Sequence, residues 1–84
     1  MKHFASPRFW GLYEALPAGT QELAHRSFTL LKLDARHPSL HLKRIGRLWS
    51  VRVGDRYRAL GTDMPDGILW IWIGTHRDYD RIIR

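Results

Sequence analysis

An uninterrupted apolar run near the end of the chain, Ile68 to Ile73, constrains the fold more than any other feature. The run is rich in Ile and Trp, and it begins directly after the turn-forming stretch Pro65 to Gly67. A short apolar run bounded by turn residues is typical of a strand that is buried on both faces of a sheet. We therefore expect a rigid internal strand, which holds the polar residues after Gly74 in a fixed place.

Two stretches earlier in the chain show helical periodicity. Ser6 and Pro7 suit the N-cap and the first position of a helix that Pro17 ends. Its apolar face contains Phe9, Leu12, Tyr13 and Leu16. A second helix is predicted from about Ala18 or Thr20 to Ala35. Its apolar stripe contains Ala24, Phe28, Leu31 and Ala35, widened by Leu23 and Leu30. Two amphipathic helices joined by a short turn form a helical hairpin with one shared apolar face.

The remainder of the chain alternates between apolar and polar residues, which indicates strands. The apolar positions are Leu40 and Leu42, then Trp49, Val51 and Val53, then Tyr57 and Ala59. Residues 2 to 5 are compatible with a short edge strand. The predicted fold class is α+β, with the N-terminal helical hairpin on one face of a twisted, mainly antiparallel sheet of three to four strands. Because Trp70 and Trp72 are two residues apart, they are expected on the same face of the sheet.

The loop after Val53 decides which side chains are neighbours. A two-residue loop at Gly54 would place basic residues beside apolar ones. A three-residue loop, with its third residue left-handed, keeps the apolar side chains on the core face. We favour this register, which places Arg52 directly opposite Arg58. Like charges that face each other are mildly destabilising, so an anion between them would be favourable.

Size and charge limit the possible functions. A chain of 84 residues predicts one domain, residues 1–84, and the absence of Cys excludes disulfides, thiolate metal sites and a cysteine nucleophile. No apolar run is long enough for a membrane span, and a cytoplasmic protein is expected. The net charge of +6 suggests an anionic partner, either a nucleic acid or an acidic protein.

Several residues could cleave RNA without a metal or another cofactor. The candidates are Lys43, Arg52, Arg58, His76, Arg77 and Tyr79. Arg binds phosphate through its planar guanidinium, whereas His, Lys and Tyr can serve as the base for a ribose 2′-hydroxyl or the acid for the leaving 5′ oxygen. In the alternative interpretation Thr75 caps a short last helix, and His76 and Tyr79 only cap and pack. A metal pair of His37 and His41 is disfavoured by the intervening Pro38.

A series of short motifs resembles the RelE/ParE superfamily of bacterial type II toxins over nearly the whole chain. The motifs are ALP at 15–17, HPSL at 37–40, WSVRVG at 49–54, YRAL at 57–60 and WIGTHRDYD at 72–80. The resemblance implies a toxin that a cognate antitoxin neutralises. RelE-like members are ribosome-dependent mRNA endonucleases, whereas ParE-like members inhibit DNA gyrase. An inactive toxin-like module that only binds an acidic protein is a third possibility.

The same resemblance implies roles for individual residues. Arg58, in YRAL, matches the arginine that RelE-like nucleases place against the scissile phosphate. The segment that contains His76 and Tyr79 is similar to the catalytic C-terminal motif of HigB-type nucleases, and Lys43 falls near the basic strand of the family. The expected catalytic residues are therefore Arg58, His76, Tyr79 and Lys43. Arg52, Arg44 and Arg77 are expected to bind RNA phosphates.

Overall fold

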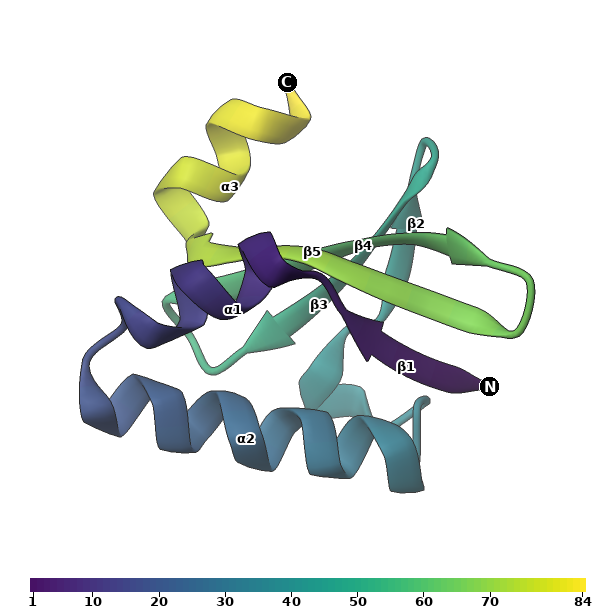
Figure 1. The fold of residues 1–84 in the computed structure, drawn as a ribbon, viewed down its shortest axis with the longest axis horizontal. Helices are drawn as coiled ribbons and strands as arrows, with labels where there is room; N and C mark the ends of the chain where they lie inside the picture. Colours follow the sequence, from purple (N-terminus) through teal and green to yellow (C-terminus); the bar gives the residue numbers. More distant parts are fainter.

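Five strands form one sheet in the spatial order β1-β5-β4-β3-β2 (Figure 1). The computed structural model describes residues 1–84. The strands are β1 (Lys2–Ala5), β2 (Lys43–Ile45), β3 (Leu48–Val53), β4 (Tyr57–Met64) and β5 (Gly67–Thr75). β1 runs parallel to β5, and the other neighbours are antiparallel. The predicted α+β class is confirmed. The sheet has more strands than expected because the N-terminal segment is paired along its whole length with β5.

Helices cover both faces of this sheet. The hairpin of α1 (Pro7–Glu14) and α2 (Ala18–Leu33) lies on one face, as predicted, and α3 (His76–Ile83) lies on the other (Figure 1). The Ser6 hydroxyl caps α1 by accepting a hydrogen bond from the Phe9 amide, at 3.1 Å. The Gln21 side-chain amide donates to carbonyls at the end of α1, among them that of Tyr13, so it closes the turn between the helices. None of the helices is long and apolar enough to cross a membrane.

The helical hairpin and the sheet enclose the main core. The predicted stripes are confirmed except at Leu23. Phe9, Ala24 and Leu31 are buried and their other stripe neighbours pack against the same cluster, whereas Leu23 is 37% exposed and lies outside it. From the sheet, β3 contributes Val51 and Val53 to this cluster. Leu60 and Tyr79 are also buried, but they lie outside this cluster, on the face that α3 covers. The molecule therefore has a main core on one side of the sheet and a small second one on the other.

The favoured register of the β3–β4 hairpin is confirmed. Val53 pairs with Tyr57, and Arg52 lies directly opposite Arg58. The left-handed residue, however, is Gly54 with φ +65°, not the third loop residue Arg56. Glycine adopts this conformation at little cost, which explains why Gly54 occupies the first position of the loop.

Two other predictions are wrong. Residues 38–40 form a 3₁₀ turn, η1 (Pro38–Leu40), and the strand begins only at Lys43, because Pro38 fixes the start of a helical turn and buries Leu40. A bulge in the β4–β5 ladder pairs Leu60 with Trp72 but the next residue with Trp70. Trp70 therefore enters the main core, and Trp72 faces the opposite side.

Candidate functional site

A polar cavity of about 440 Å³ lies on the face of the sheet that α3 covers. It is lined by His41, Lys43, Ser50, Arg52, Arg58, His76, Tyr79 and Asp80. The lining contains three permanent cations and a single carboxylate, so its electrostatic potential favours an anion. It also contains two imidazoles and two hydroxyls, which are groups that can transfer protons.

Strand register brings the cations together. Lys43 on β2 pairs with Ser50 on β3, and Arg52, two residues further along β3, pairs with Arg58 on β4. Paired residues share a face, and so do residues two apart on one strand. These four side chains therefore project from one face, and the alternation predicted from the sequence is what places them there.

The loop between β3 and β4 holds both arginines. Arg52 donates through Nε to the Gly54 carbonyl at 3.2 Å and forms an ion pair with Asp55. Arg58 donates through Nη1 to the carbonyls of Tyr57, Gly54 and Asp55, at 2.7, 3.3 and 3.4 Å. Arg58 has no carboxylate partner, and its Nε and Nη2 form no hydrogen bond. Half of its guanidinium fork is thus free to meet a phosphate.

Helix α3 supplies the proton-transfer candidates. The Thr75 hydroxyl caps the helix by accepting from the Asp78 amide at 3.2 Å, as the alternative interpretation expected. The His76 amide donates to the Arg56 carbonyl at 2.8 Å, while its side chain is exposed at the cavity. Tyr79 is buried and its hydroxyl bonds to Ser50. His76 and Tyr79 therefore belong to a capped, packed helix and also line the cavity. Their catalytic roles stay a prediction.

Two predicted RNA-binding residues lie elsewhere. Arg44 donates two hydrogen bonds to Asp63, at 2.6 and 3.1 Å, and its guanidinium carbon lies 4.7 Å from the centre of the Trp49 ring. As the neighbour of Lys43 on the strand, it points to the opposite face. Arg77 is exposed on α3 and does not line the cavity.

Sequence reasoning missed three lining residues. His41, which adopts a left-handed conformation after η1, was considered only as a metal ligand. Asp80 looked like one more solvated helix residue, although its spacing of four from His76 places both on one side of the helix. Ser50 carried the clearest available signal, because it follows Trp49 in the position that faces Lys43. No cluster of three or more His, Cys, Asp or Glu side chains is placed to hold a metal.

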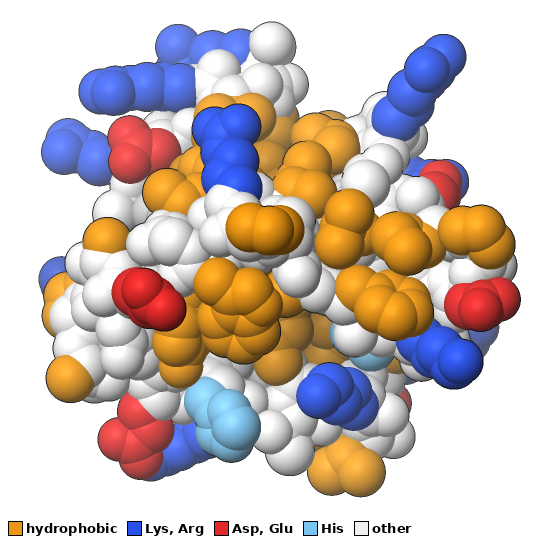
Figure 2. Space-filling model, viewed as in Figure 1, with side chains coloured by type: hydrophobic (Ala, Val, Ile, Leu, Met, Phe, Trp, Pro, Cys, Tyr) orange, Lys and Arg blue, Asp and Glu red, His pale blue; other side chains and the backbone are white.

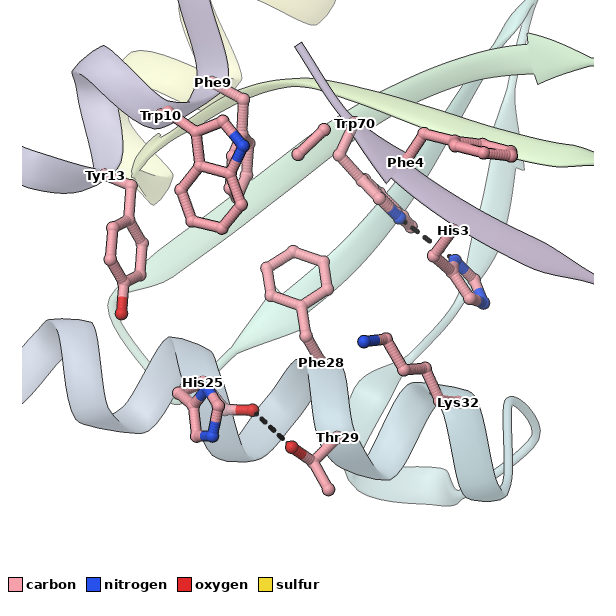
Figure 3. Close-up of a pocket in the computed structure, with 11 residues that line it drawn as sticks. His3, Phe4, Phe9, Trp10, Tyr13, His25, Phe28, Thr29, Lys32 and Trp70 are labelled. Carbon is pink, nitrogen blue, oxygen red and sulfur yellow. Dashed lines mark hydrogen bonds between the residues drawn. The ribbon is translucent and has the colours of Figure 1, made fainter. Parts of the chain in front are cut away.

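A second cavity, of about 320 Å³, lies on the other side of the sheet between β1, α1 and α2 (Figure 3). Its wall is mainly aromatic, formed by Phe4, Phe9, Trp10, Tyr13, Phe28 and Trp70, and no acidic residue lines it. Hydrophobic side chains gather on the surface here, with charged side chains of both signs around them (Figure 2). Trp10 is 49% exposed and Phe4 39%. This cavity suits an apolar ligand group rather than a phosphate.

His3 lies in the wall of this aromatic cavity. Its Nδ1 accepts a hydrogen bond from the Trp70 indole at 3.1 Å, and the two rings are stacked. Partial burial lowers the pKa of His3 below its ordinary value of 6.5, and the positive charges of the N-terminus and Lys32 lower it further. The neutral imidazole that this favours is the form that can accept from Trp70.

Comparison with known proteins agrees with the fold. The family model of the ParE-like toxin domain matches residues 21–81. The structure is similar to the RelB–RelE antitoxin–toxin complex from Methanococcus jannaschii, with a TM-score of 0.72, 13% identity, and coverage of 96% of this chain and 99% of that one. It is also similar to the isolated E. coli RelE toxin, with a TM-score of 0.64, 12% identity, and coverage of 95% and 96%. No curated protein matches the sequence significantly.

Proposed function

The chain belongs to the family of ParE-like toxin domains, within the RelE/ParE superfamily, and from this premise we propose that it is a ribosome-dependent mRNA endonuclease. The proposal rests on the cavity under α3. Three cations line it together with hydroxyl and imidazole groups, and it contains only one carboxylate. A gyrase inhibitor without chemistry of its own has no need of such a set. A cytoplasmic toxin that cuts translated mRNA would use the cations to bind phosphate and the hydroxyl and imidazole groups to transfer protons.

The proposed reaction divides the cavity into a phosphate-binding half and a proton-transfer half. Arg58, supported by Arg52, stabilises the charge that develops on the scissile phosphate. His76 or Lys43 takes the proton from the 2′-hydroxyl, whose oxygen attacks phosphorus and forms a cyclic phosphate. As the bond from phosphorus to the 5′ oxygen breaks, Tyr79 or His76 gives that oxygen a proton. The free Nε and Nη2 of Arg58 support its place at the phosphate.

A cognate antitoxin is the proposed protein partner, since the solved M. jannaschii relative is in complex with a RelB antitoxin. The aromatic cavity is the surface we assign to it, through an acidic segment with a bulky apolar side chain. The exposed Trp10 and Phe4 supply apolar contact, and the ammonium of Lys32 lies close to the opening between Phe28 and His3 in Figure 3. Because no acidic residue lines the wall, an acidic segment would meet the Lys32 ammonium there without a carboxylate beside it.

Replacing an exposed aromatic residue of this cavity tests the assignment. Trp10→Ser is expected to raise the Kd for the proposed cognate antitoxin roughly tenfold or more, because an aromatic anchor is lost. Isothermal titration calorimetry measures this Kd. Leu33→Ser is the matched control, since Leu33 is 81% exposed on α2 outside the cavity. Equal Kd values for the two variants would place the antitoxin elsewhere.

The matching family model describes a ParE-like toxin domain. Because the ParE-like toxins that the sequence resembles inhibit DNA gyrase, a gyrase inhibitor is the second candidate function. On this account the cationic cavity is an ordinary solvated face, and the toxin acts by binding a protein. A toxin-like module without toxicity is the remaining possibility.

Induced expression of the chain alone separates these candidates. The nuclease account predicts growth arrest, with new mRNA 5′ ends that keep a fixed position relative to the reading frame on ribosomes. Intact mRNA with gyrase-linked DNA breaks would establish the second candidate instead. Harmless expression of the folded chain would contradict both forms of toxicity.

A further inference from the structure

Ser50 is a polar residue in a position that packing alone would fill with an apolar one. It is 2% exposed in the middle of β3, beneath α3, and it is the only buried residue with an aliphatic polar side chain. Its side chain forms a single hydrogen bond, with the Tyr79 hydroxyl, at 2.8 Å. Tyr79 is 5% exposed, and both residues line the cationic cavity.

The direction of this hydrogen bond follows from the number of partners. Both hydroxyls line the cavity, but Ser50 is the more deeply buried, at 2% exposed against 5% for Tyr79. If Tyr79 donated, the Ser50 proton would have no acceptor within the protein, because the Ser50 side chain forms no other hydrogen bond. A buried unsatisfied donor costs about 1–3 kcal/mol. If Ser50 donates, both hydroxyls are satisfied, because the Tyr79 proton can point into the open cavity. The second arrangement is therefore favoured.

We propose that Ser50 is a positioning residue, which fixes the Tyr79 hydroxyl so that its proton faces the substrate in the cavity. The inference rests on the proposed nuclease function and assigns the acid to Tyr79 rather than His76. When the bond from phosphorus to the 5′ oxygen breaks, the Tyr79 proton passes to that oxygen. The phenolate left behind accepts the Ser50 hydrogen bond and lies among the cations of the cavity until water reprotonates it.

Tyrosine bands in resonance Raman spectra test the direction of the bond without RNA. The intensity ratio of the tyrosine Fermi doublet distinguishes a phenol that accepts a strong hydrogen bond from one that donates. The difference spectrum between the wild type and Tyr79→Phe isolates Tyr79 from Tyr13 and Tyr57. We expect the intensity ratio of a phenol that accepts a hydrogen bond as well as donating one to solvent in the cavity. Ser50→Ala should lower this ratio towards that of a phenol that only donates. A donor pattern in the wild type overturns the inference, even if the protein cleaves mRNA.

Single-turnover cleavage of ribosome-bound mRNA tests the consequence. Ser50→Ala is expected to slow cleavage roughly tenfold with an unchanged half-saturating toxin concentration, and Ser50→Thr to restore the rate, since it keeps the hydroxyl. In the Tyr79→Phe background, Ser50→Ala should have no further effect. Ser27→Ala, on α2 away from the cavity, is the control for a lost serine hydroxyl.

Several kinetic outcomes contradict the inference. One is a folded Ser50→Ala protein with the wild-type rate, and another is a folded Ser50→Thr protein as slow as Ser50→Ala. A slower rate for Ser50→Ala within the Tyr79→Phe background would mean that Ser50 acts independently of Tyr79. Absence of cleavage by the wild type would instead contradict the proposed function, while the Raman pattern still decides the direction of the bond.

Discussion

At the scale of single residues, two arginines that share one face and one loop differ in the charge that meets them. Arg52 forms an ion pair with Asp55, whereas Arg58 has only carbonyl partners. A guanidinium that is oriented but not neutralised is ready to bind an anion, because no carboxylate must first be displaced. The contacts with the loop therefore hold the two like charges opposite each other across the hairpin. They also leave Arg58 as the cation that is more available to an anion.

The single carboxylate of the cavity should limit its affinity for RNA. Asp80→Asn removes a negative charge that repels phosphate, and we expect roughly twofold to fivefold tighter binding of a short single-stranded RNA at low salt. Fluorescence anisotropy measures the affinity. Asp66→Asn changes the net charge equally at the turn before β5, outside this cavity, and it should have little effect. Equal tightening by both variants would mean that only net charge matters.

The stability of the fold should fall in mild acid because of His3. Its pKa is lowered in the folded state, so the unfolded chain binds the proton more tightly. The stabilising contribution is complete above about pH 6.5, the unfolded value, and is lost as the pH falls towards the folded value. Urea denaturation at several pH values measures this loss. His3→Gln should lack this contribution to the pH dependence, and an unchanged profile would contradict the role of His3.

At the scale of elements, the β3–β4 hairpin connects the two sides of the sheet. Gly54 begins its loop with φ +65°, and a Cβ at this position would collide with Leu23 of α2. The same loop holds Arg52 and Arg58 on the opposite face. The helical hairpin and the cavity thus depend on one short turn, although they lie on different faces.

Gly46 and Gly54 have the same left-handed backbone conformation. Substituting each by Ala therefore separates the cost of backbone strain from the cost of a steric collision. Gly46, with φ +59°, has open space around its Cβ position, so Gly46→Ala should cost only the left-handed strain of about 1–2 kcal/mol. Gly54→Ala should cost about 0.5–1.5 kcal/mol more in the free energy of unfolding, because Leu23 must change rotamer. Chemical denaturation measures both values. Leu23→Ala should remove the difference, and its persistence in that background would contradict the collision.

The elements that the sequence predicts well are those with a regular period. The stripes of Phe9 and Ala24 repeat with the helical period, and the alternation around Val51 determined the hairpin register. No periodic pattern in the sequence reveals the bulge that places Trp70 and Trp72 on opposite faces, since the bulge depends on how β4 and β5 twist against the helices. For the site, alternation placed three cations correctly. Alternation also places Ser50 on the face of these cations, but its contact with Tyr79, like the position of Asp80, arises only when α3 packs on the sheet.

At the scale of the whole molecule, the sheet divides two chemically different surfaces. One face holds the cationic cavity beneath α3, and the other holds the aromatic cavity between β1 and the helical hairpin. A net charge of +6 favours anionic ligands, which fits both the proposed RNA substrate and the proposed acidic segment of an antitoxin. The two ligands are proposed to bind different faces, so neutralisation by the antitoxin must act through ribosome access or through a segment that also reaches α3.

The most direct test of the central claim is cleavage of mRNA on purified ribosomes by the wild type and by Arg58→Ala. We predict that the wild type cuts, and that folded Arg58→Ala is slower by about 10²-fold or more, because the developing phosphate charge loses its main stabilising group. Arg58→Lys should recover only part of the rate, and Arg26→Ala, with its exposed side chain on α2, should match the wild type. A folded Arg58→Ala protein that cleaves at the wild-type rate would contradict the account.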